Sequence, residues 1–129
     1  MISSHFDCIE KIIRNDPLVI YVNLHRNFTS LNTAYIKGEI TFADGSSLAV
    51  FQHVRIQESE LFITDYRYHC MTHDRQLIFR YDNAPHHSEI TTFPHHKHLP
   101  LDVQSADMPD IEDVLAETDS LVIKNSVII

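Results

Sequence analysis

The feature that most limits how this chain can fold is a period-two pattern of apolar and polar residues between residues 18 and 81. This alternation predicts strands with one buried face, because successive side chains of a strand point to opposite sides. Asp44-Gly45 suits a tight turn between two of the strands, and the other links are also short. We therefore expect a five-stranded antiparallel meander sheet with strands at Leu18–Arg26, Ala34–Phe42, Ser47–Ile56, Ile63–Cys70 and Gln76–Tyr81.

The segments on either side of this sheet have other patterns. Apolar residues at helical spacing predict an N-terminal helix over Phe6–Arg14. Four prolines, at positions 85, 94, 100 and 109, predict a long histidine-rich functional loop over residues 82–109. A short C-terminal helix, Asp110–Glu117, and a strand, Leu121–Ile129, are expected after it. The whole pattern predicts a single α+β domain over residues 1–129, and its apolar last strand favours a homodimer.

Composition excludes some classes of function. The net charge of −8 argues against a generally basic nucleic-acid-binding surface, although a local basic site is still allowed. No apolar run reaches the roughly 18–20 residues that cross a membrane, and the first residues do not resemble a signal peptide. The two cysteines, Cys8 and Cys70, have neither metal-ligand nor redox spacing. We expect a cytoplasmic protein without a membrane contact.

Histidine is concentrated in the middle of the chain. The sequence has ten histidines, and seven of them lie between residues 69 and 98. Histidine titrates near neutral pH, so it can take the 2′-OH proton of RNA or protonate the leaving oxygen. Arginine and lysine can neutralise the charge on phosphorus. These residue types together indicate phosphodiester cleavage that needs no metal.

The strands that lead into the loop carry polar residues at alternate positions. Asp65, Arg67 and His69 share one face of their strand. If the register allows it, one sheet face gathers five potential cations, namely His53, Arg55, Arg67, His69 and Arg80. Such a cluster needs a carboxylate or a bound anion, and a phosphate-bearing ligand fits. We assign the neighbouring aromatic residues to the core rather than to base stacking, namely Tyr66, Tyr68, Phe79 and Tyr81.

Each of these features also has a simpler explanation. Paired histidines can bind a transition metal, although His95 and His98 do not have a recognised zinc-ligand spacing. Arg67 and Arg80 can form cross-strand salt bridges. The isolated histidines are more often structural than catalytic, namely His5, His25, His53 and His73.

The histidine-rich region resembles the TumE family. The similar segments are Tyr66-Arg67-Tyr68-His69, then Leu77-Ile78-Phe79-Arg80-Tyr81-Asp82-Asn83-Ala84-Pro85-His86-His87, then Thr92-Phe93-Pro94-His95-His96-Lys97-His98, and later the acidic Ile111-Glu112-Asp113-Val114-Leu115. Cys70 departs from the pattern, because similar proteins often carry an aromatic residue there. TumE-like proteins are small prokaryotic toxins of toxin–antitoxin pairs, usually encoded beside a helix-turn-helix antitoxin. The resemblance implies a toxin that cleaves RNA or blocks translation, with an antitoxin protein as its partner.

We assign the chemistry to the polar residues of this region. The expected catalytic residues are His69, His86 and His96, with Asp82 to orient a histidine. Substrate contacts are expected from Arg67, Arg80, Asn83, His87, His95, Lys97 and His98. We expect RNA or a small oligonucleotide as the substrate of this ribonuclease or phosphodiesterase, and neither a metal nor a cofactor. Two other functions stay open: a nuclease for small cyclic oligonucleotide second messengers, and a non-catalytic regulator that binds metal or nucleotide.

Overall fold

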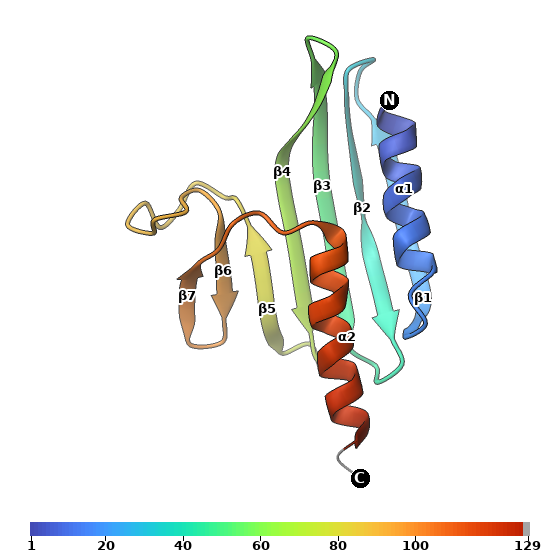
Figure 1. Ribbon diagram of the computed structural model, residues 1–129, viewed down its shortest axis with the longest axis vertical. Coiled ribbons are helices and arrows are strands. Elements are labelled where there is room, and N and C mark those ends of the chain that lie inside the picture. Colours follow the sequence, from blue (N-terminus) through green and yellow to red (C-terminus); the bar gives the residue numbers. More distant parts are fainter. Residues whose placement is uncertain (128–129) are drawn as a thin grey trace.

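The structure is a computed structural model that describes residues 1–127 of the chain. Seven strands form one antiparallel sheet whose strand order follows the chain (Figure 1). The elements are α1 (Ile2–Arg14), β1 (Val19–Phe28), β2 (Thr33–Phe42), β3 (Ser47–Gln57), β4 (Glu60–Met71), β5 (Leu77–Asp82), β6 (His96–Leu99), β7 (Asp102–Ser105) and α2 (Ile111–Val127). The α+β class and the meander are therefore confirmed, but the predicted number of five strands was wrong.

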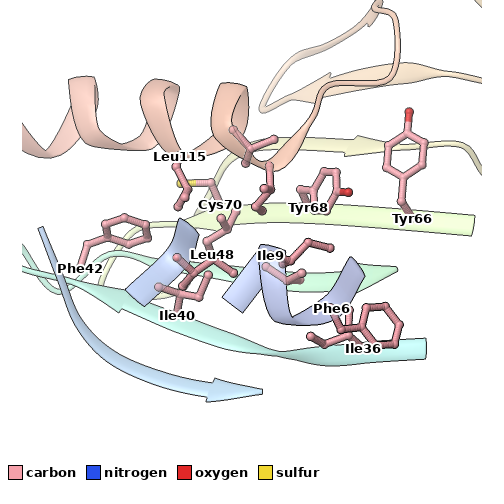
Figure 2. Close-up of a cluster of buried hydrophobic side chains, with 14 of the residues drawn as sticks. Phe6, Ile9, Ile36, Ile40, Phe42, Leu48, Tyr66, Tyr68, Cys70 and Leu115 are labelled. Atoms are coloured by element: carbon pink, nitrogen blue, oxygen red, sulfur yellow. The ribbon is translucent and has the colours of Figure 1, made fainter. Parts of the chain in front are cut away.

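Both helices cover the same face of the sheet (Figure 1). Helix α1 buries Phe6, Ile9 and Ile13, which recur at helical spacing and so form one apolar stripe. Figure 2 shows the side chains of Phe6 and Ile9 meeting alternate residues of the strands, such as Ile36 and Tyr68, and Leu115 of α2 belongs to the same core. The opposite face carries the other residues of each strand, and neither of the two described helices covers it (Figure 1). We call it the open face.

The first five strands follow the predicted alternation. Tyr66, Tyr68 and Cys70 are buried under the helices, whereas Arg67 is exposed on the open face and His69 is half-buried there. The assignment of Tyr66, Tyr68 and Phe79 to the core is confirmed, because each is at most 2% exposed.

The predicted loop over residues 82–109 was wrong in part, because it contains the hairpin β6–β7. Each of these strands is only four residues long, which is too short to produce a recognisable alternation. Backbone pairing of β6 with β5 and of β7 with β6 stabilises them in spite of the prolines around them. Pro94 precedes β6 and Pro100 lies in the turn, so neither removes a hydrogen bond inside a strand. Residues 83–95 are irregular, as predicted.

The predicted C-terminal strand was also wrong. Helix α2 continues through the segment that was assigned to Leu121–Ile129, as far as residue 127; residues 128–129 lie outside the described part. Asp110 starts the helix, since its carboxylate accepts a hydrogen bond from the Asp113 backbone N–H at 2.8 Å. Val114, Leu115, Thr118 and Val122 are buried against the sheet at helical spacing. This packing outweighs the strand preference of the β-branched residues. The predicted homodimer was based on a strand in this segment, and the segment is helical instead.

Neither described helix is long and apolar enough to cross a membrane.

Candidate functional site

Two rows of polar residues cross the open face where β4, β5 and β6 lie side by side. Residues directly opposite each other in paired strands share a face, so the register defines each row. One row joins His69, Arg80 and His98, and the other joins Arg67, Asp82 and His96. We call these six residues the histidine–arginine cluster. The predicted grouping of Arg67, His69 and Arg80 on one sheet face is therefore confirmed, and β6 adds two histidines to it.

Asp82 is the centre of the cluster. Asp82 is buried, with 5% of its surface exposed, and each of its two carboxylate oxygens contacts other residues. Oδ1 lies 2.8 Å from Nε2 of His96, and Oδ2 accepts a hydrogen bond from Nε of Arg80 at 2.9 Å. Oδ2 also lies 3.5 Å from Nε2 of His98, and the Ala84 backbone N–H donates to Oδ1 at 3.0 Å. A buried carboxylate needs such partners, so Asp82 holds the cluster together.

His96 is the most enclosed histidine of the cluster, with 2% of its surface exposed. Its Nδ1 lies 2.8 Å from the carbonyl oxygen of Pro94 and donates to it, while its Nε2 faces Asp82. Both ring nitrogens of His96 are thus in contact with other groups of the protein. In this geometry His96 orients Asp82, and no ring nitrogen of His96 is left to contact a substrate.

The loop after β5 folds over this part of the open face. It places the His87 ring 5.5 Å from that of His96 and 5.6 Å from that of His98, and the last two rings are 4.6 Å apart. His87 has a positive φ of 60°, an uncommon conformation for a residue other than glycine. Such backbone geometry occurs often at functional sites. Three imidazoles therefore meet beside the Asp82 carboxylate.

Partial burial and nearby positive charge lower the pKa of both histidines in the row His69–Arg80–His98. Burial lowers the pKa of His69, and the charges of Arg80, Arg67 and Arg75 lower it further. Burial also lowers the pKa of His98, assisted by Arg80, while Asp82 acts in the opposite direction. Both imidazoles are therefore biased towards the neutral form, in which a ring nitrogen can accept a proton.

The other predicted site residues lie outside the cluster. Asn83 has a structural contact, because its side chain bonds the Tyr66 N–H at 3.1 Å and the Thr64 carbonyl at 3.0 Å. His95 lies with its Nδ1 3.0 Å from the hydroxyl of the core residue Tyr66. His86 is exposed on the loop, where its ring belongs to neither row.

Lys97 lies on the helix-covered face, since it sits between His96 and His98 in β6. Its Nζ is 2.7 Å from Oε2 of Glu117 in α2, and it packs over the rings of Phe79 and Tyr81. Glu117 also accepts a hydrogen bond from the Tyr81 hydroxyl at 2.7 Å. These contacts tie β6 to α2, on the opposite side of the sheet from Arg80.

The side chains of Asp82, His96 and His98 are also the one group of the described chain whose potential ligand atoms could meet at a metal ion. These atoms lie within 4.8 Å of one another. Asp82 and His96 already contact each other, and Arg80 bonds the same carboxylate. A cation at this position would have to separate Asp82 from His96 and approach the guanidinium.

A hollow of about 400 Å³ lies on the open face beside the cluster. Its lining side chains include Asn23, His25, Tyr35, Lys37, Glu39, Ala49, Phe51 and Arg67. The residues of β1 to β3 in this group were not predicted to belong to a site, and His25 was expected to be structural. The alternation within β2 already placed Tyr35 and Lys37 on one face of that strand, and the alternation within β3 placed Phe51 on one face of its own. Only the register of the sheet brings the three residues together beside Arg67.

Comparison with known proteins supports one assignment. No curated protein and no solved structure matches the chain significantly. The family described as toxin TumE matches residues 9–124, which include both rows of the cluster, the end of α1 and most of α2. The chain therefore belongs to the TumE toxin family.

Proposed function

We propose that this protein is a toxin that cleaves RNA without a metal at the histidine–arginine cluster. The observation that carries the proposal is the row His69–Arg80–His98, in which an arginine lies between two partly buried imidazoles. Neighbouring strands are about 4.8 Å apart, so the two histidines flank Arg80 with roughly 10 Å between their backbones. Side chains that converge from this separation can reach opposite sides of one phosphate.

The roles follow from the positions in the row. His69 takes the proton of the ribose 2′-OH, whose oxygen then bonds to phosphorus. The bond from phosphorus to the 5′ oxygen breaks, and that oxygen receives a proton from His98. Arg80 and the exposed Arg67 neutralise the phosphate, while Asp82 and His96 position Arg80 and His98.

The substrate itself adjusts the two histidines. The charge of Arg80 lowers the pKa of both His69 and His98 in the free protein. A phosphodiester bound to Arg80 would offset that charge, so the pKa of each imidazole would rise towards neutrality. One imidazole can then hold the proton that the leaving oxygen needs.

Membership in a toxin family implies an antitoxin that binds this chain. We propose a helix-turn-helix protein encoded beside it as that partner. The uncovered sheet face offers such a protein a direct way to block the cluster.

Small cyclic or linear oligonucleotides are the second candidate substrates. The net charge of −8 favours them, because a short ligand needs only a local group of cations whereas a long RNA crosses more of an acidic surface. A metal-binding regulator is the third candidate, and the close approach of Asp82, His96 and His98 favours it.

One experiment separates these functions. Purified protein is incubated, with EDTA and with added metals in parallel, against total RNA and against cyclic oligoadenylates. The variants are His69→Ala and His98→Ala, with His73→Ala as the control because His73 is exposed at the β4–β5 turn. We expect the wild type and the control to cleave RNA in EDTA, and each cluster variant to lose about a hundredfold or more in rate.

Each other outcome changes the assignment. Cleavage of the cyclic substrates alone selects the second candidate. Activity that requires added metal, or one equivalent of metal retained by the purified protein without activity, refutes the metal-independent mechanism. If both cluster variants cleave RNA as fast as wild type, the site has been placed wrongly.

A further inference from the structure

The hollow on the open face is continuous with the histidine–arginine cluster. In the register of the sheet, Lys37 of β2 lies opposite Phe51 of β3, and Phe51 lies opposite Arg67 of β4. Arg67 in turn lies opposite Asp82. One row of the sheet thus leads from the hollow directly into the cluster, and Arg67 belongs to both.

The hollow has an aromatic floor. The rings of Tyr35 and Phe51 lie with their centroids 5.9 Å apart, and both side chains are half-exposed. The guanidinium of Arg67 lies 5.6 Å from the centre of the Phe51 ring. Ala49, the next open-face residue along β3, has only a methyl group and leaves space above the sheet. Flat aromatic surfaces beside a guanidinium are the features that hold unpaired bases by stacking.

The charge of the hollow is locally positive although the chain is acidic. Glu39, the acidic residue of its lining, is held by Arg75 at 2.7 Å. Lys37 and Arg67 have no carboxylate within ion-pair distance in the described part of the chain. These two cations are therefore available to the phosphates of a ligand that lies across the strands.

We propose that the aromatic groove, defined as Tyr35, Lys37, Ala49, Phe51 and Arg67, binds a nucleobase and ribose of the substrate. The base stacks on Phe51 and Tyr35 while Arg67 holds the phosphate that connects it to the cluster. Strand β3 lies two strand spacings, about 10 Å, from β5, a distance that one to two extended nucleotides can cover. The inference rests on the proposed function and specifies its substrate as single-stranded RNA that crosses β2 to β5.

The test measures binding separately from cleavage. The probe is a single-stranded hexanucleotide with one fluorescent 2-aminopurine base and with 2′-O-methyl riboses, which lack the 2′-OH that attacks phosphorus. We expect stacking to quench its fluorescence, and we expect Phe51→Leu to abolish the quenching and raise Kd about tenfold. The control is Phe62→Leu, because Phe62 is an exposed aromatic residue at the far end of β4 and outside the groove. Tyr35→Leu provides a second groove variant if Phe51→Leu does not fold.

The outcomes separate this inference from the proposed function. If Phe51→Leu and Tyr35→Leu bind and quench the probe as the control does, the groove is not a base-binding site, even if the protein cleaves unmodified RNA. If the groove variants lose binding but the wild type cleaves no RNA, the groove stands and the cleavage mechanism fails. Equal binding of the same sequence as a duplex would contradict recognition of an unpaired base.

Discussion

Replacement of Asp82 by asparagine tests the cluster most directly. The buried carboxylate contacts Arg80 at 2.9 Å and His96 at 2.8 Å, and it faces His98 at 3.5 Å. Asparagine has almost the same size, and its oxygen can still accept the bond from Ala84. The variant therefore removes the negative charge and leaves the shape of the site nearly unchanged.

The expected cost follows from the burial of the three partners. Removing one member of a buried ion pair costs about 3–5 kcal/mol, because the other charge stays without compensation. His96 is fully enclosed, but the Arg80 side chain is 33% exposed and can recover some hydration. We therefore expect Asp82→Asn to lower the free energy of unfolding by about 2–3 kcal/mol. A domain of ordinary stability stays folded after a loss of that size.

Urea unfolding at pH 7, followed by circular dichroism, measures this loss. With a dependence of about 1–3 kcal/mol per molar urea, the midpoint should fall by about 1–3 M at an unchanged slope. Glu39→Gln is the matched control, because its ion pair with Arg75 lies in solvent and should not move the midpoint measurably. A midpoint for Asp82→Asn that equals that of the control would refute the central role of this carboxylate.

A double-mutant cycle tests the contact between Asp82 and His96. Asp82 and His96 contact each other directly, so Asp82→Asn and His96→Gln should not be additive. We expect a coupling free energy of about 1–2 kcal/mol between them. Additive losses would mean that the two side chains stabilise the fold independently.

Two further predictions concern titration. Burial and then the Arg80 charge lower the pKa of both His69 and His98, so Arg80→Gln should raise both pKa values. Arg67→Gln should raise only the pKa of His69. NMR titration of the imidazole C–H signals measures these pKa values, and unchanged values in Arg80→Gln would contradict the prediction. In α2, burial and a hydrogen bond to Asp16 raise the pKa of Asp119 to about 7, so the folded state keeps a proton that the unfolded chain loses near pH 4. Stability should therefore fall as the pH rises from 4 to 7, and Asp119→Asn should remove this dependence and stabilise the protein at pH 8 by about 1 kcal/mol after a discount for solvent screening. If the unfolding midpoints of wild type and Asp119→Asn depend on pH in the same way, the contact between Asp119 and Asp16 does not control this pH dependence.

The first five strands could be predicted because each is long enough to show its alternation. Ten to twelve residues form each of β1 to β4, so several apolar side chains recur on the helix-covered face. The same alternation separated Tyr66 and Tyr68 from Arg67 and His69. Which side chains of one strand share a face is a local property, and a local pattern predicts it.

The last third of the chain could not be predicted in this way. Strands β6 and β7 are four residues long, and they exist because β6 pairs with the edge of β5 and β7 pairs with β6. The β-branched end of the chain is helical, since a helix lets Val114, Leu115 and Val122 reach the core together. In both segments long-range packing outweighs the local preference of the residues.

The sequence by itself determined three features of this protein. Histidine and arginine are concentrated in one region, the strands alternate between apolar and polar residues, and several segments resemble a toxin family. The tertiary structure alone decided which of those residues meet. Pairing of β6 with β5 places His96 beside Asp82 and His98 beside Arg80, and it sends Lys97 to the other face. The physical reason is that strand register depends on contacts across residues 83–95 and on the partners that a buried carboxylate requires, and neither is encoded in a local pattern.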